Sequence, residues 1–467
     1  MNALIIGSLL FYALVTAALG LWTRGRNEDT SEDYYVASRS VSWLHLGLTV
    51  TATWFSTFSF LGAPGFFFTK GVKWYVSFTF YTFGGVVLFW FFSRKIWLMG
   101  RGKNYITPAD LLADFYNSVL IRYLVGIVSL IALVPYALIQ LVGIGKAVEV
   151  ATNNFISYET VVISTGVVTA FYVFTGGVRA VLWTDIIQGI LFAFVIVVAM
   201  GIAVYAAGGL SSGFAAAVEK RPELFVFAEG DFLNTVSFMA TWTIGFITLP
   251  HLWQRSYMAD SADGLIKSGI VVAFGGLLMI TALMVTGVLC ISFMDVAGDS
   301  DKLIVTMFSE HCPYAVPLLI LAVFASGMST VDSQLLTASS IFVRDIVKPL
   351  KSSLDTRTER LLGQYFLVGL IAVLVVLALL PDAQGPIIAL ATKGTALAVM
   401  LFIPLLGPTY LPAANKVSAV GALTLGSLYY VLADIGYVDT AFGLTSFLSA
   451  LLLNTVVFFF LYFCTKK

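Results

Sequence analysis

The sequence predicts an all-α integral membrane protein, and three observations carry that prediction. Of the 467 residues, 59% are apolar and only 11% are charged. The mean hydropathy is +0.93. A soluble protein carries about 25% charged residues, because its surface faces water. Apolar runs of about 20 residues, the length that crosses a bilayer as a helix, recur along the chain. These properties exclude soluble enzymes, nucleic-acid binders and disulfide-rich secreted proteins.

Apolar windows between charged or Gly/Pro-rich breaks predict about 13 transmembrane helices. Their limits are 3–22, 43–68, 73–92, 123–150, 156–175, 181–207, 233–252, 266–293, 314–343, 361–380, 384–405, 412–433 and 441–463. A β-barrel does not fit, because its strands alternate over about 10 residues instead of running continuously apolar. The connections are too short for a folded soluble domain, so residues 1–467 are expected to form a single transmembrane domain.

The distribution of Lys and Arg predicts the orientation. With the N-terminus outside, 19 of these residues fall in inner segments and 6 in outer segments; Lys393, inside a span, completes the 26. Basic residues accumulate on the cytoplasmic side. We therefore expect a multi-pass protein with its N-terminus outside and its C-terminus cytoplasmic. The compact chain with short loops indicates a protein of the plasma membrane, of the kind found in the bacterial inner membrane. Basic and acidic residues are equal in number, so no nucleic-acid partner is indicated.

A stripe of hydroxyl side chains marks the span 314–343. Ser326, Ser329, Thr330 and Ser333 stand at i, i+3, i+4 and i+7, which places them on one helix face, with Asp332 at its edge. Small hydroxyl residues also allow helices to pack closely. Considered without Asp332, the stripe is compatible with that packing role. Hydroxyl oxygens beside a carboxylate equally suit a hard cation, which takes oxygen ligands.

The span 43–68 is polar at its middle and contains a proline. Thr51, Thr53, Ser56 and Thr57 precede Pro64, which removes a backbone donor and frees nearby carbonyls. A simple kink is one outcome. Because non-helical backbone at membrane depth is tolerated where it lines a cavity, we expect a broken helix at a binding site.

Two further polar features lie in or near spans. Thr184, Asp185 and Gln188 stand at the entrance of the span 181–207, where Asp185 is either solvated at the surface or faces the interior. Lys393 lies a third to halfway along the otherwise uncharged span 384–405, which is deep for a snorkelling side chain. We expect it to have a functional or paired role.

No signature of enzyme chemistry is present. The sequence has no Gly-rich phosphate loop, no zinc-spaced histidine pair and no nucleophile elbow. The three cysteines have neither an even count nor metal-site spacing. We therefore expect no catalytic residues and a protein that is not an enzyme.

Three stretches, in this order, resemble the sodium/solute symporter family, which includes the sodium–proline, sodium–glucose and sodium–sialic acid cotransporters. They are FTGGVRAVLWTDIIQ, TWTIGFITLPHLWQRSYMADS and SGMSTVDSQLLTASSIFVRDI. The resemblance runs from the first span to the last. It implies a LeuT-like 5+5 inverted-repeat core with discontinuous helices. Residues 43–207 would form the first repeat and 233–405 the inverted second, with peripheral helices in 1–42 and 406–467.

The resemblance also implies two ion sites, with sodium as the cofactor. The main site, between the broken second span and the ninth, would use the carbonyls of Ala52, Phe55 and Ser326 and the hydroxyls of Ser329 and Thr330. A second, more cytoplasmic site would use Asp185, Ser329, Asp332 and Ser333. Asp332 stands where a member with this site has a serine, so that position is open to sodium or to a proton.

The family's solute pocket maps onto nine positions beside the sodium. They are Thr53, Trp54, Ser56, Thr57, Tyr136, Gln140, Trp242, Phe246 and Lys393. The chain departs from proline carriers at Trp54 and Phe246, and from sugar carriers at Lys393. Because no acidic residue in its own span can neutralise Lys393, an anionic group of the solute is its simplest partner, with internal pairing as the alternative.

Together these features predict a sodium-coupled symporter that imports a small carboxylate-bearing solute: a monocarboxylate, an amino acid or an acidic sugar. Its partners would be the solute, sodium and the lipid bilayer, with no obligatory protein partner. A sodium-coupled symporter of neutral sugars or polyols, a transporter-like sensor and a channel are the alternatives. The short C-terminal tail disfavours the sensor, and a broken-helix site at mid-membrane suits a channel poorly.

Overall fold

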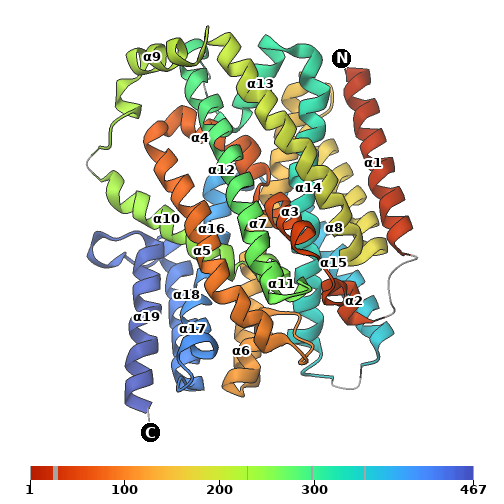
Figure 1. Cartoon of the computed structure of the whole chain (residues 1–467), viewed down its shortest axis with the longest axis vertical. Helices are drawn as coiled ribbons and strands as arrows, with labels where there is room; N and C mark the ends of the chain where they lie inside the picture. Colours follow the sequence, from red (N-terminus) through yellow and green to blue (C-terminus); the bar gives the residue numbers. More distant parts are fainter. Residues whose placement is uncertain (1, 25–29, 229, 296–297, 352–353, 466–467) are drawn as a thin grey trace.

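The computed structural model describes residues 2–24, 30–228, 230–295, 298–351 and 354–465. Within these ranges every regular element is a helix, and the one isolated β-bridge joins Val41 to Ala259. The long helices are α1 (Asn2–Arg24), α5 (Tyr75–Gly100), α7 (Val119–Ala151), α8 (Tyr158–Ala206), α12 (Ala262–Phe293), α14 (Val316–Ile341), α15 (Thr356–Ala378), α18 (Lys416–Asp434) and α19 (Ser446–Thr465). They run mostly along the long axis of one bundle (Figure 1).

Ten helices in the described ranges are long and apolar enough to cross a membrane, and the bent pair α10–α11 makes eleven. The predicted count of 13 is therefore not confirmed. Two of the predicted spans explain the difference. The span 43–68 is divided among shorter elements, and 156–175 contains only the short apolar helix Tyr158–Phe171. The latter ends before a break in α8 at Gly177, whose φ of 60° and ψ of −162° suit glycine.

Two helices are interrupted near the middle of the bundle. The first consists of α3 (Trp43–Trp54), a π-helical turn η2 (Phe58–Gly62) and α4 (Ala63–Lys70). The second consists of α10 (Asp231–Thr248) and α11 (Pro250–Met258), which are bent by 42° at Leu249. Pro250 begins α11, where its missing N–H is not needed for a helical hydrogen bond. The predicted broken helix in 43–68 is thus present, but its break precedes Pro64.

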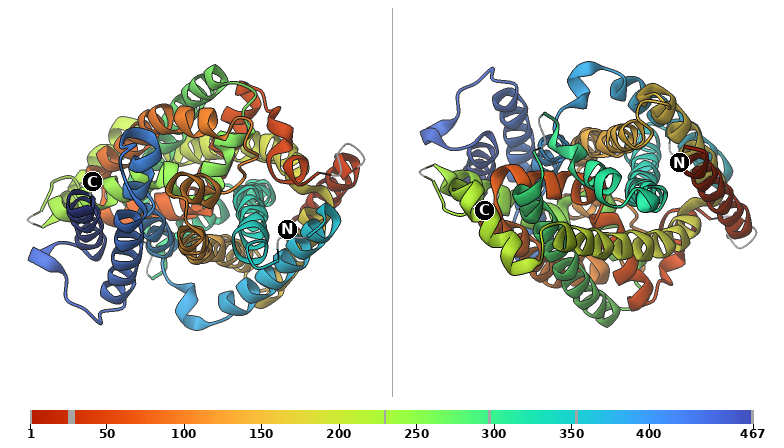
Figure 2. Two further views of the ribbon diagram at one scale, coloured as in Figure 1. Left: turned by 90° about the horizontal axis from the view of Figure 1, so that it is seen from below. Right: turned by 90° about the horizontal axis from the view of Figure 1, so that it is seen from above.

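Shorter elements complete the chain. They are α2 (Ser31–Val36), η1 (Ala37–Arg39), η3 (Val72–Trp74), α6 (Pro108–Tyr116), α9 (Leu210–Lys220), η4 (Pro222–Leu224), η5 (Ser300–Lys302), α13 (Leu303–His311), η6 (Pro313–Ala315), η7 (Phe342–Val347), η8 (Pro381–Gln384), α16 (Ile387–Val399), α17 (Phe402–Tyr410) and η9 (Ala441–Gly443). The start of α1 and the end of α19 lie at opposite ends of the bundle in Figure 1. The end-on views place α1 and the α18–α19 pair at opposite edges, with the broken helices between them (Figure 2).

The lower ends of the two broken helices are joined through the backbone. Val41, just before α3, donates its N–H to the carbonyl of Met258 at 3.0 Å. Its own carbonyl accepts the N–H of Asp260 at 3.0 Å. These bonds tie the start of α3 to the end of α11, so the two segments form one unit at this end of the bundle.

Candidate functional site

The break in the first discontinuous helix lies at Phe55, with φ −90° and ψ 84°. A helix that ends here leaves carbonyls and N–H groups without intrahelical partners. Gln140 on α7 supplies one replacement, because its side-chain oxygen accepts the N–H of Thr57 at 3.2 Å and its hydroxyl at 2.7 Å. The Ser56 hydroxyl supplies another by accepting the N–H of Phe58 at 3.2 Å. Two residues assigned to the solute pocket therefore stabilise the break itself.

Carbonyls at the end of α3 meet the hydroxyl stripe of α14. Ser329 Oγ lies 3.0 Å from the carbonyl oxygens of both Ala52 and Ser326. Thr330 Oγ1 lies 3.0 Å from the carbonyl oxygen of Thr53 and 3.4 Å from that of Ser326. All of these residues are buried.

This oxygen cluster fits a hard cation. Ligands at about 2.4 Å from an ion in octahedral geometry lie about 3.4 Å from one another, close to the spacing found here. The donor set consists of neutral carbonyl and hydroxyl oxygens, which suits a monovalent ion better than a transition metal. Four of the five residues that the resemblance assigned to the main sodium site thus come together near the break: Ala52, Ser326, Ser329 and Thr330. The fifth, Phe55, is the residue at which α3 ends.

A second buried cluster contains an arginine that sequence analysis assigned to an inner loop. Nη2 of Arg255, on α11, lies 3.1 Å from Asp185 Oδ2, 2.6 Å from Ser333 Oγ and 3.0 Å from Thr53 Oγ1. The Thr49 hydroxyl also donates to Asp185. Arg255 is 1% exposed and Asp185 0% exposed. Asp185 therefore lies in the interior of the protein, and the positive charge beside it is the guanidinium of Arg255.

Asp185, which the resemblance places in the second ion site, already has a positively charged partner within the protein. The guanidinium of Arg255 neutralises Asp185, and an ion pair at this depth compensates for the cost of burying either charge alone. Asp332 lies next along the chain to Ser333, whose N–H it accepts at 2.6 Å. The available signal for Arg255 was the PHLWQR stretch, which is part of the family resemblance. In the structure this stretch forms the first six residues of the short helix α11.

Aromatic side chains of the predicted solute pocket form one buried cluster. The Trp54 ring lies 5.6 Å from Trp242 and 4.8 Å from Phe246, and the Tyr136 ring lies 6.0 Å from Trp242. Tyr81, which sequence analysis did not identify, packs 5.8 Å from Trp54. The cluster joins α3, α5, α7 and α10 around the two helix breaks, at separations typical of interacting rings.

Within the described ranges, buried polar atoms in and beside this cluster lack a hydrogen-bond partner. They are the indole nitrogen of Trp242, the hydroxyl of Tyr136 and both ring nitrogens of His251. The His251 ring lies 5.8 Å from that of Tyr136. Buried polar atoms are normally hydrogen-bonded, so unpaired ones indicate where a polar ligand binds. Sequence analysis missed His251 because it looked for a zinc-spaced histidine pair, although the residue lies in the PHLWQR stretch that resembles the family.

Lys393 does not belong to this set, and of the two partners considered for it, a group of the solute or an acid of the protein, the structure shows the second. Its Nζ lies 3.0 Å from Asp434 Oδ2, on α18, and its side chain is 49% exposed. The packing of its neighbours on α16 determines where the Lys393 side chain points. Gly394 packs against α7, and Thr395 packs against Gly245 of α10, so Lys393 faces α18 instead. Asp434 escaped notice because it lies one residue beyond the predicted span 412–433.

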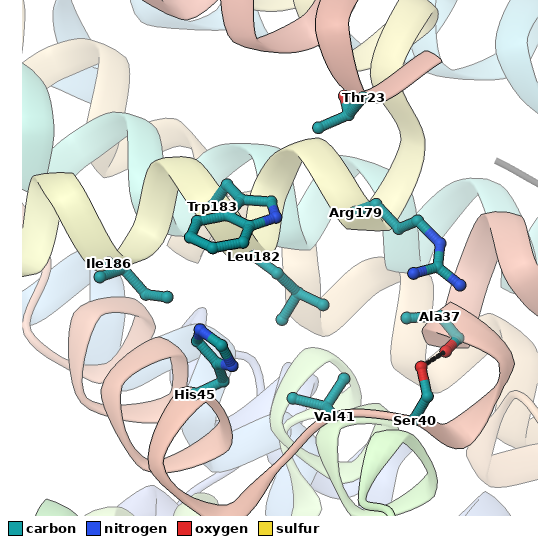
Figure 3. A pocket seen from close by; sticks show the side chains of 9 residues that line it. All are labelled: Thr23, Ala37, Ser40, Val41, His45, Arg179, Leu182, Trp183 and Ile186. Atoms are coloured by element: carbon teal, nitrogen blue, oxygen red, sulfur yellow. Dashed lines mark hydrogen bonds between the residues drawn. The ribbon is translucent and has the colours of Figure 1, made fainter. Parts of the chain in front are cut away.

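A separate cavity of about 260 Å³ lies where α1 ends, between η1, α3 and α8 (Figure 3). None of the predicted site residues lines it. Arg179, at its edge, binds both carboxylate oxygens of Asp33 at 2.5–3.1 Å. This arginine therefore anchors the segment after α1 to α8.

Comparisons with known proteins agree with this geometry. The model of the family described as "Sodium:solute symporter family" matches residues 34–426. The sodium/pantothenate symporter of Escherichia coli (strain K12) is 29% identical over 92% of this chain and 91% of its own length. A sodium/proline symporter of Staphylococcus aureus (strain bovine RF122 / ET3-1) is 23% identical over 98% and 92%. The solved structure of a Na⁺-coupled sialic acid symporter, in a substrate-bound outward-open state, aligns with a TM-score of 0.80 at 18% identity, over 98% of this chain and 96% of that one.

Proposed function

The chain belongs to the sodium:solute symporter family, and from this premise we propose that it imports a small carboxylate-bearing organic solute. The solute class comprises monocarboxylates, amino acids and acidic sugars. The protein is a sodium-coupled membrane transporter and not an enzyme. We place it in a bacterial inner membrane, with its N-terminus outside, its C-terminus in the cytoplasm, and its inverted repeats in 43–207 and 233–405.

The observation that carries the proposal is the meeting of the α3 break with the hydroxyls of α14. Ser329 Oγ and Thr330 Oγ1 lie 3.0 Å from the carbonyl oxygens of Ala52 and Thr53, respectively. A sodium ion bound by Ala52, Phe55, Ser326, Ser329 and Thr330 would hold the end of α3 against α14. Sodium binding would thereby stabilise one conformation over another, which is the requirement for coupling.

The solute would bind in the aromatic cluster beside that ion, in contact with Thr53, Trp54, Ser56, Thr57, Tyr136, Gln140, Trp242 and Phe246. The unpaired indole N–H of Trp242 and the ring nitrogens of His251 provide hydrogen-bonding capacity for a carboxylate. Asp185 does not repel an acid, because Arg255 neutralises it. The relatives named for pantothenate and for proline support an acid, since both of those solutes carry a carboxylate.

The proposed second ion position is already in contact with a positive charge of the protein. A sodium ion or proton at Asp185, Ser329, Asp332 and Ser333 would have to compete with Arg255, whose guanidinium bonds two of those four residues. We therefore expect one sodium ion per solute.

Uptake into proteoliposomes tests the function. With an inward sodium gradient, we expect saturable uptake of a carboxylate and little uptake of its amide, and no accumulation when potassium replaces sodium. Preference for neutral sugars or polyols would overturn the solute class. Sodium-independent flux that does not saturate would instead indicate a channel.

A further inference from the structure

The helix α1 lies at one edge of the bundle, against α8 and α14 (Figures 1 and 2). It precedes the first of the proposed repeats. The hydroxyls of Thr16 and Thr23 donate to carbonyls of α1 itself. Tyr12 differs, because its hydroxyl accepts a hydrogen bond from the side-chain amide of Gln188 on α8. The helix α1 is therefore joined to its neighbours by a polar contact as well as by apolar packing.

Tyr12 separates two mostly apolar cavities beneath α1. The larger has a volume of about 380 Å³ and is lined chiefly by residues of α1, α8 and α14. The smaller has a volume of about 120 Å³ and is lined by residues of the same three helices. Tyr12 belongs to the lining of both cavities. Because a void offers no contact atoms to the side chains around it, the contacts of Tyr12 hold α1, α8 and α14 together between two loosely packed regions.

The two ends of the Tyr12 side chain reach the two helices behind the proposed main sodium site. Its ring packs edge-on against Phe324, with 6.2 Å between ring centres, two residues before the hydroxyl stripe of α14 begins. Its hydroxyl bonds Gln188, which is 2% exposed and directly precedes Gly189 on α8. A Cβ at Gly189 would lie 3.1 Å from the Cβ of Ala52, so α8 is in close contact with the end of α3 at this level.

We propose that Tyr12 is a positioning residue for the main sodium site. It braces α8, on which Ala52 rests, against α14, which carries Ser329 and Thr330. The side-chain oxygen of Gln188 has no hydrogen-bond partner among the described residues, so the bond to Tyr12 is what fixes this buried amide. Ligands on separate helices bind an ion tightly only when the helices are already held at the right separation. This inference rests on the proposed sodium site.

Sodium binding to Tyr12→Phe tests this role. The variant keeps the ring against Phe324 and removes only the hydroxyl. In equilibrium binding of ²²Na⁺ to the purified full-length protein, the Kd for sodium should rise about fivefold, as expected for one hydrogen bond. Thr16→Val is the matched control, because it removes a buried hydroxyl of α1 that bonds to its own helix and should leave the Kd unchanged. An equal rise of the Kd in both variants would overturn the assignment. So would a Tyr12→Phe variant that melts at a lower temperature but keeps the wild-type Kd.

A double-mutant cycle tests the path through Gln188. Tyr12→Phe, Gln188→Leu and the double variant should show the same rise of the sodium Kd, because each of them breaks the same bond. Losses that add in the double variant would refute this path. Ser329→Ala/Thr330→Ala, measured in parallel, separates the two proposals. Weakened sodium binding in that variant together with an unchanged Kd in Tyr12→Phe contradicts only the positioning role, whereas unchanged binding in Ser329→Ala/Thr330→Ala contradicts the main site itself.

Discussion

Replacement of Arg255 by glutamine should create a second sodium site. In the wild type, Nη2 of Arg255 lies 3.1 Å from Asp185 Oδ2 and 2.6 Å from Ser333 Oγ, two of the oxygens that the second ion would need. Arg255→Gln removes the positive charge and leaves these oxygens in place. A buried carboxylate that has lost its partner is unstable, so it should take up a cation from solution.

The magnitude follows from the distance. Two unit charges 3.1 Å apart attract each other by about 5 kcal/mol at an effective dielectric constant of 20. A sodium ion must displace this interaction in the wild type but not in the variant. At 1.4 kcal/mol per factor of ten, sodium affinity at the second position should therefore differ by about three to four orders of magnitude. The wild type should bind one ion at millimolar sodium, and Arg255→Gln should bind two.

Equilibrium binding of ²²Na⁺ to purified protein measures this count without a solute. The double variant Arg255→Gln/Asp185→Asn is the matched control, because it removes both charges and should return the count to one. Arg255→Gln should also melt at a lower temperature without sodium and regain more stability than the wild type when sodium is added. Two ions bound to the wild type, or one bound to Arg255→Gln, would refute the reasoning.

Three further predictions concern other parts of the protein. Ser329→Ala/Thr330→Ala removes two oxygens from the main cluster. At about 1 kcal/mol per lost contact, the sodium concentration for half-maximal uptake should rise at least tenfold. The control Thr286→Ala removes a buried hydroxyl that bonds to its own helix, so this sodium concentration should not change. Lys393→Gln should change the affinity for the acid less than twofold. It should cost about 1 kcal/mol or less of stability, because the Lys393 side chain in the pair with Asp434 is half exposed. A loss of acid binding would instead show that Lys393 belongs to the solute site. Asp110→Asn should cost roughly 3 kcal/mol, because it breaks a buried pair in which Asp110 contacts Arg122 at 2.7 Å and Arg344 at 3.1 Å. Burial opposes ionisation of Asp110, but Arg344 and Arg122 outweigh it and hold its pKa below the ordinary value. Its contribution to stability should therefore be complete above about pH 3.9 and be lost as the pH falls through the folded-state pKa, so thermal unfolding of the wild type, but not of Asp110→Asn, should carry this dependence.

Sequence patterns predicted those features that repeat with the geometry of a helix. The stripe from Ser326 to Ser333 lies on the face of α14 that meets α3, because spacings of three and four residues fix the face regardless of the neighbouring helix. Pro64 predicted a break in the span 43–68, and the hydroxyl residues before it predicted that the break lines a binding site. The position of the break was less predictable. Pro64 suggested it, but the chain leaves the helix at Phe55, where Gln140 of α7 supports the exposed backbone.

Features that depend on a distant partner could not be predicted in this way. Arg255 counted as an inner-loop charge because it follows an apolar span by only a few residues, yet the bend at Leu249 turns α11 inward. For Lys393, only acids inside the predicted spans were considered as internal partners, whereas its partner in the structure is Asp434, the last residue of α18. In both cases the deciding quantity is the position of one helix relative to another, which hydropathy and periodicity do not contain.

Thr53 links the two buried clusters. Its carbonyl oxygen lies 3.0 Å from Thr330 Oγ1 in the main oxygen set, and its hydroxyl lies 3.0 Å from Arg255 Nη2 in the second. An ion that recruits Thr330 changes the first contact, and release of Asp185 by Arg255 changes the second. Because α3 and α11 are also joined through Val41, a movement of either half-helix must carry the other. An ion at the proposed main site and a separation of these half-helices from α8 and α14 would therefore change the same few bonds, which is the coupling that a symporter requires.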